Sequence, residues 1–226
     1  MIHFALPMRI ISDHKGFLDE ITQEKGIKEK IKSLLVSTFT FLAIYGILMG
    51  ASRSLLQALL SAIKLPILFL LTLAICFPTL HIFNTLFGSR QKVGQYFVLL
   101  LSCISVAGLL LIAFAPITLF FLLTTDHYQF YKLLNVAILA IAGFFGVRYL
   151  YQGMSVVGQT AKADDKKLQR ILILWIVLYA FVGSQLAWTI RPFFGSPGMR
   201  VEIIRDLHGN FYTDIVRAVL EILGFQ

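Results

Sequence analysis

The sequence predicts an all-α integral membrane protein, a polytopic bundle of five transmembrane helices with amphipathic helices at both ends of the chain. Three observations predict this class: five apolar stretches of membrane-spanning length, a shortage of charged residues, and basic residues that flank the stretches. A soluble domain usually carries about 25% charged residues, whereas this chain of 226 residues carries 14% and has a mean hydropathy of +0.79. Lipid is therefore expected to replace water over much of the surface.

Each apolar stretch is about as long as a bilayer is thick. A hydrocarbon core of about 30 Å needs roughly 20 helical residues, and helices are expected because lipid offers the backbone no hydrogen bonds. The predicted spans cover residues 33–51, 65–87, 96–123, 133–151 and 171–190. We accordingly expect a cytoplasmic amphipathic segment (1–32), a transmembrane bundle (33–191) and a non-cytoplasmic tail with an interfacial helix (192–226).

Prolines are expected to shape the second and third spans. Apolar character begins well before residue 65, so Lys64-Leu65-Pro66 is predicted to separate a short interfacial helix (54–63) from the second span. Pro78 is expected to kink the second span, and Pro116 to kink or end the third.

Small residues recur at four-residue spacing in three spans. The pairs are Gly46 and Gly50, Ala142 and Gly146, Ala180 and Ser184, and Gly183 and Ala187. Such pairs let helix backbones approach closely. They indicate packing inside one bundle or, as the alternative, a dimer face.

The N-terminal segment has an amphipathic pattern over residues 13–31. Hydrophobic residues fall on one helical face, Ser12 or Asp13 is a candidate cap, and Gly26 weakens the middle of the helix.

A second amphipathic pattern lies in the C-terminal tail, where Asn210 is a candidate cap. Asp214, Arg217 and Glu221 fall on one side of the predicted helix, opposite its hydrophobic residues. The helix is too short to span, so it is expected to lie on the outer membrane surface or to dock against a partner.

Basic residues predict the orientation. The five-span arrangement puts 13 of the 20 Lys and Arg residues on the side of the N-terminus and seven on the other side. Positive residues favour the cytoplasmic face, so the N-terminus is expected in the cytoplasm and the C-terminus outside. The predicted location is a bacterial inner membrane or, alternatively, a thylakoid membrane. The net charge of +8 is explained by topology and anionic lipid, and no nucleic-acid partner is expected.

The sequence contains no GxGxxG, GxxxxGK[ST], HExxH or GxSxG motif. Cys76 and Cys103 lack a CxxC or Cys/His spacing. We therefore expect no catalytic residues, no metal ligands and no cofactor.

Polar and aromatic residues near span ends are the remaining site candidates, because polar groups within a bilayer are costly. His81 and Asn84 lie three residues apart, where they could bind a headgroup, a proton or a cofactor, or hydrogen-bond a neighbouring helix. Trp188 lies near the end of the fifth span, and Arg191, Phe193 and Phe194 follow it. These residues favour a structural boundary or, as the alternative, a gate or ligand clamp.

Three sequence segments also carry a resemblance. The pattern KLP…CFPTLHIFNTLFGS, FAPITLFFLLTT and YAFVGSQLAWTIRPFFGSPG, within residues 50–212, resembles a family of poorly characterised bacterial five-span membrane proteins, some of them labelled actin-binding. The chain is more distantly similar to the Yip family of membrane trafficking proteins, without the DLYGP-type motif of its eukaryotic members.

Together these features predict a non-enzymatic membrane subunit or scaffold that belongs to a larger complex, binds other membrane subunits or self-associates. The alternative is a small transporter or channel, suggested by Pro66, Pro78 and Pro116 and by His81 and Asn84.

Overall fold

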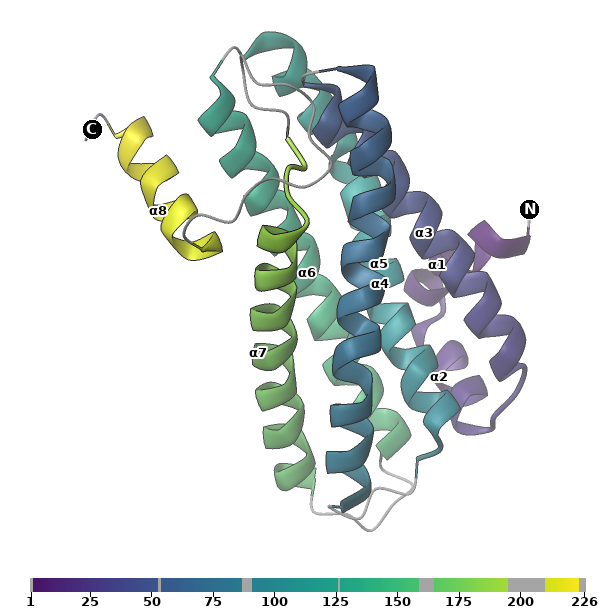
Figure 1. Ribbon diagram of the computed structural model, residues 1–226. Coiled ribbons are helices and arrows are strands. Elements are labelled where there is room, and N and C mark those ends of the chain that lie inside the picture. Colours follow the sequence, from purple (N-terminus) through teal and green to yellow (C-terminus); the bar gives the residue numbers. More distant parts are fainter. Residues whose placement is uncertain are drawn as a thin grey trace.

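The fold is a bundle of long helices. The computed structural model describes residues 2–52, 54–86, 91–125, 127–158, 165–194 and 210–223, which form eight helices and no strand, as the all-α prediction requires. Five long helices run side by side in alternating directions (Figure 1). They are α3 (Ile27–Ala51), α4 (Leu55–Leu86), α5 (Val93–Thr124), α6 (Tyr128–Gly158) and α7 (Asp165–Thr189).

All five long helices are apolar enough to cross a membrane, which confirms the predicted bundle. The helix α3 packs on both α4 and α5, while α6 packs mainly on α5 and α7 mainly on α4. About 61% of the most apolar part of α5 is buried, against 17% of that of α7. Thus α5 lies at the centre of the bundle, and α7 lies at its periphery.

The second span differs from the prediction at Pro66. The separate interfacial helix predicted over 54–63 is wrong, because α4 continues through Pro66 and Pro78 to Leu86. At Pro116 the predicted end of the third span is wrong, because α5 continues to Thr124. The kinks at Pro78 and Pro116 stay predictions. Neighbouring helices and polar side chains can satisfy the backbone groups that a proline frees inside a membrane helix.

Close packing on α3 explains why the first turns of α4 belong to the bundle. A Cβ atom at Gly46 would collide with the carbonyl oxygen of Ser61, and one at Gly50 with that of Gln57. Only glycine lets the two backbones approach this closely. The Gly46 and Gly50 pair therefore packs within the bundle.

The N-terminal segment forms two helices, α1 (Ile2–Ser12) and α2 (His14–Thr22). Asp13 caps α2, since its side chain accepts a hydrogen bond of 3.1 Å from the backbone N–H of Gly16. Of the two candidate caps, Asp13 is therefore the one in use.

The single helix predicted over 13–31 is wrong. The chain turns after α2, and Gly26 adopts a left-handed φ of 61°, a conformation that glycine reaches without steric cost. Ile27 then begins α3, so the last predicted turns belong to the first span.

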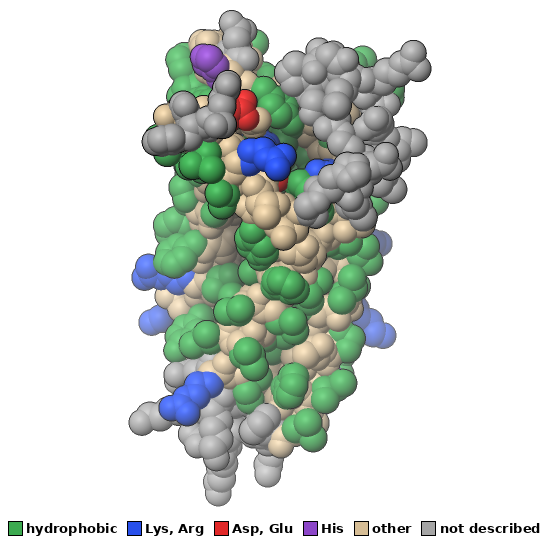
Figure 2. All heavy atoms as spheres, turned by 60° about the vertical axis from the view of Figure 1, so that its left-hand side comes forward, with side chains coloured by type: hydrophobic (Ala, Val, Ile, Leu, Met, Phe, Trp, Pro, Cys, Tyr) green, Lys and Arg blue, Asp and Glu red, His purple; other side chains and the backbone are tan. Residues whose placement is uncertain are grey.

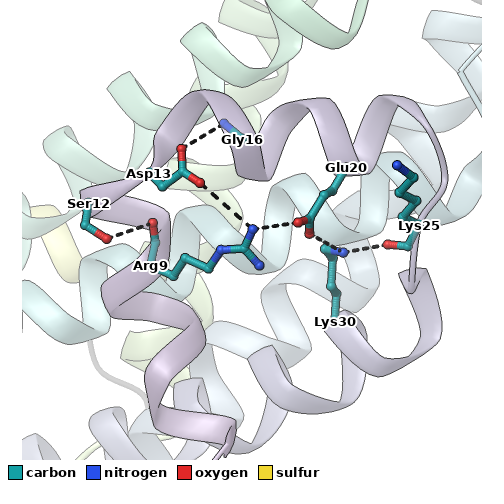
Figure 3. Close-up of polar contacts among 7 residues, drawn as sticks. All are labelled: Arg9, Ser12, Asp13, Gly16, Glu20, Lys25 and Lys30. Atoms are coloured by element: carbon teal, nitrogen blue, oxygen red, sulfur yellow. Dashed lines mark hydrogen bonds and ion pairs between the residues drawn. The ribbon is translucent and has the colours of Figure 1, made fainter.

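The helices α1 and α2 pack onto the side of the bundle: α1 contacts α3 and α5, and α2 contacts α5 and α6 (Figure 1). Phe17, Leu18 and Ile21 are fully buried in this contact. Figure 3 shows a polar network beside this buried contact. In it, the Glu20 carboxylate lies 2.6 Å from Arg9 Nη2 and 2.9 Å from Lys30 Nζ. We call this the Glu20 network; it links α1, α2 and α3.

The predicted C-terminal helix is confirmed as α8 (Phe211–Ile222). The Asn210 side chain caps it by accepting a hydrogen bond of 2.9 Å from the backbone N–H of Thr213. It lies against α6 and α7 (Figure 1). In the structure, α8 thus docks against the bundle itself.

Candidate functional site

The chain that follows α7 is anchored to α4 by hydrogen bonds. The carbonyl oxygen of Pro192 accepts from Gln57 Nε2 at 2.9 Å and from Lys64 Nζ at 3.1 Å. The carbonyl oxygen of Phe193 accepts from Ser61 Oγ at 2.6 Å. All three donors are buried and recur along one face of α4, where they satisfy carbonyl groups that apolar helices could not.

Phe193 and Phe194 lie in the hydrophobic core, each 9% exposed. The Phe194 ring meets the Tyr131 ring of α6 edge to face, with centroids 6.0 Å apart. The anchored backbone therefore places these two rings between helices.

Trp188 and Arg191 form a cation–π pair at the end of α7. The Arg191 guanidinium carbon lies 3.6 Å from the centroid of the Trp188 ring. This contact holds the guanidinium beside an amphipathic ring of the kind that favours the membrane–water interface.

A cavity of about 250 Å³, which we call the basic cavity, lies between α6, the end of α7 and α8. Its lining includes Lys132, Val136, Trp188, Arg191, Phe211 and Asp214. Lys132 is 9% exposed, and its Nζ atom lies 3.0 Å from Asp214 Oδ2 of α8. Among the described residues that line the cavity, Lys132 and Arg191 are the cations, and Lys132 is paired with the Asp214 carboxylate.

The structure does not bring His81 and Asn84 to this cavity. Lys64, which contacts Pro192 beside the cavity, and Asn84 both lie on α4, and the helix rises about 30 Å between them. His81 and Asn84 therefore lie at the opposite end of the bundle from the basic cavity. The His81 ring packs against the rings of Phe77 and Tyr96, with centroids 6.4 Å and 5.9 Å away. The Asn84 side chain is 1% exposed, and neither its oxygen nor its nitrogen has a hydrogen-bond partner.

Asn135, in the fourth span, has the partners that Asn84 lacks. Its Oδ1 accepts from the Tyr45 hydroxyl at 2.9 Å, and its Nδ2 donates to the Tyr131 carbonyl at 2.9 Å. The Tyr45 hydroxyl also lies 3.2 Å from Thr118 Oγ1, so one buried network joins α3, α5 and α6.

Sequence reasoning missed several residues of the basic cavity and its anchor. Gln57, Ser61 and Lys64 could have been found as polar residues spaced along one face of an apolar helix. Lys132 and Asp214 carry no such signal, because they lie 82 positions apart and only the docking of α8 brings them together.

No known protein family, curated protein or solved structure matches the chain. The resemblance inferred from the sequence therefore stays a prediction. Among the described residues, no three His, Cys, Asp or Glu side chains lie close enough together to hold a metal ion.

Proposed function

We propose that this chain is a non-enzymatic integral membrane subunit or scaffold that forms part of a larger membrane complex or assists one. The observation that carries the proposal is the uncovered apolar surface of α7. Only 17% of its most apolar part is buried by the rest of the chain, although the helix is long enough to span. Leu174, Val177 and Phe181 are each more than half exposed.

The neighbouring surface of α6 supports a protein partner. Phe144 is 63% exposed and Phe145 is 46% exposed, and the small residues Ala140 and Ala180 lie between the two helices. Large rings beside small residues form the uneven surface on which a second helix can pack closely. Figure 2 shows that hydrophobic side chains cover much of this side of the molecule and that the acidic side chains visible among its described residues lie near the upper end.

The proposed orientation follows from the basic residues. With α1, α2 and the start of α3 in the cytoplasm, 13 of the 20 Lys and Arg residues lie on the cytoplasmic side. The basic cavity and α8 then lie at the outer end, and the membrane is the inner membrane of a bacterium.

Site-directed photocrosslinking in native membranes tests the proposal. A photoreactive residue at Leu174 or Val177 should yield a discrete protein adduct, identified by mass spectrometry as a partner or a second copy. The matched control is Ile44, which is similarly apolar and 44% exposed but lies on α3. Lipid adducts alone at all three positions would contradict the proposal.

One observation favours a transporter or channel as the second candidate function. The buried amide of Asn84 has no partner, and unsatisfied polar groups inside a membrane frequently mark ion or substrate pathways. Under this function, Asn84→Leu and His81→Ala should each abolish flux of the transported ion in liposomes. Unchanged flux in both variants would remove the proposed pathway.

A further inference from the structure

Two polar contacts with α6 fix the position of α8 at the end of the bundle (Figure 1). Near the start of α8, Asp214 Oδ2 lies 3.0 Å from Lys132 Nζ. Near its end, Glu221 Oε2 accepts a hydrogen bond of 2.8 Å from Gln129 Nε2. Between the two contacts, Ala218 is 1% exposed. One face of α8 is therefore held against the bundle along the length of the helix.

A second face of α8 carries large hydrophobic side chains that the bundle leaves exposed. Their spacing of three or four residues puts them on one side of the helix. Each is at least 40% exposed, and we call them the apolar stripe: Tyr212, Val216, Val219, Leu220 and Leu223. The stripe begins beside α7, where the Tyr212 hydroxyl lies 3.0 Å from Ser184 Oγ.

The remaining face of α8 is polar and exposed. Thr213, Arg217 and Glu221 follow one another there at intervals of about one helical turn. The circumference of α8 is thus divided into a face on the bundle, the apolar stripe and a polar face. Such a division suits a helix at a membrane surface that also packs on its own protein, because protein, lipid and water then each meet one side.

The contacts of α8 also set the depth of the apolar stripe. Ser184 lies about 7 Å of helix rise before Thr189, where α7 ends. Lys132 lies about 6 Å of helix rise after Tyr128, where α6 begins. Because the first turn of α8 contacts both residues, it lies this far inside the ends of two spans. Amphipathic helices bury their apolar face about 5–10 Å into the boundary between headgroups and acyl chains.

We propose that the apolar stripe of α8 inserts into the lipid leaflet at this end of the bundle. Lipid is the apolar medium around five spans at this depth, and the polar face places Arg217 at the level of the headgroups. None of the five stripe residues belongs to the surface of α6 and α7 that we propose for a partner. The inference requires that the bundle crosses the membrane and does not require that the chain is a complex subunit.

Electron paramagnetic resonance of attached spin labels tests the proposal, because it separates lipid, water and protein around a side chain. Molecular oxygen concentrates in lipid, a water-soluble nickel chelate stays in water, and a label covered by protein meets neither. The full chain in phosphatidylcholine nanodiscs carries one label, at Val216→Cys or Leu220→Cys in the stripe or at Arg217→Cys on the polar face. The unmodified chain, treated identically, corrects for any label on Cys76 and Cys103.

The ratio of oxygen to nickel collisions should be about threefold or more higher at both stripe positions than at Arg217→Cys, as expected for a helix with one face among acyl chains. A higher nickel than oxygen exposure at the stripe positions would show that the stripe lies in water. Low exposure to both reagents would show that protein covers it. Either result would overturn the proposal.

A matched pair of charge variants tests whether the apolar character of the stripe causes insertion. With the label at Val219→Cys, Val216→Asp should lower the oxygen-to-nickel ratio towards that of the polar face. Thr213→Asp adds the same charge to the polar face and should leave the ratio unchanged. Leu220→Asp replaces Val216→Asp if the latter fails to fold. An equal change, or no change, in the stripe and polar-face variants would contradict insertion by the stripe.

Discussion

Two buried asparagines in the spans have opposite surroundings. Asn135 is fully engaged by the Tyr45 hydroxyl and the Tyr131 carbonyl, whereas Asn84 has no partner for either side-chain atom. A buried polar group without a partner carries a desolvation cost of about 1–3 kcal/mol, while a satisfied one stabilises the fold modestly. Equivalent substitutions at the two positions should therefore have opposite effects.

We expect Asn84→Leu to raise the free energy of unfolding by about 1–2 kcal/mol, because it removes an unsatisfied amide and adds apolar contact. Asn135→Leu should lower the free energy of unfolding by about 1 kcal/mol, because it disrupts an interhelical hydrogen bond in the membrane. Thermal unfolding followed by intrinsic fluorescence measures both. A lower melting temperature for Asn84→Leu would show that the amide is bound by a partner in the membrane.

The Glu20 network makes the docking of α1 and α2 dependent on pH. Hydrogen bonds from Lys30 and Arg9 lower the pKa of the Glu20 carboxyl below its ordinary value of 4.5. A lowered pKa means that the folded state favours the carboxylate. The stabilisation is therefore complete above about pH 4.5 and is lost as the pH falls through the lowered pKa.

Glu20→Gln should loosen α2 at neutral pH in the same way as protonation does. Amide hydrogen exchange in α2 is expected to accelerate in this variant, and in the unmodified protein between pH 6 and pH 3 after correction for intrinsic exchange. Asp19→Asn is the control, since Asp19 is the exposed acidic neighbour. Equal acceleration in the two variants would show that the Glu20 network does not hold α2.

The sequence correctly predicted the five long helices, because their formation depends on the length of each apolar stretch. Five stretches of about 20 apolar residues must be helical in lipid wherever they pack, and all five were found. The boundaries that depend on tertiary contacts were missed. Local rules for proline end a helix at Pro66, but contact of α4 with Gly46 and Gly50 keeps these turns in the bundle.

The N-terminal segment shows the same limit. Its hydrophobic pattern correctly indicates that Phe17, Leu18 and Ile21 share a buried face. The spacing of hydrophobic residues does not reveal the turn at Gly26. Ile27 and Ile31 fit the same spacing, although they belong to the next helix, α3. The pairing of Lys132 with Asp214 was similarly unpredictable, since it requires the placement of α8 on α6.

The contact between α3 and α4 should be sensitive to a single methyl group. Gly46→Ala or Gly50→Ala should lower the free energy of unfolding by about 1–3 kcal/mol, the usual cost of overpacking, because the new Cβ meets backbone carbonyl oxygens. Gly143→Ala is the matched control within a span, because space is open there. Melting temperatures in one detergent compare the three variants; an equal shift at Gly46 and Gly143 would contradict the packing described.

At the scale of the whole molecule, lipid is the solvent around the five-helix bundle that we describe. The uncovered apolar face of α7 and the exposed rings of Phe144 and Phe145 on α6 have a common explanation if the bundle spans a bilayer. An odd number of spans then puts the two ends of the chain on opposite sides, and the orientation we propose from the bias in basic residues has the N-terminus in the cytoplasm.

Reporter fusions in a bacterial host measure this arrangement most directly. Alkaline phosphatase, which is active only outside the cytoplasm, should be active after residue 226 and inactive after residue 158, whereas green fluorescent protein should fluoresce only at the second position. A fluorescent, phosphatase-inactive C-terminal end, or protein recovered in the soluble fraction without detergent, would contradict the account.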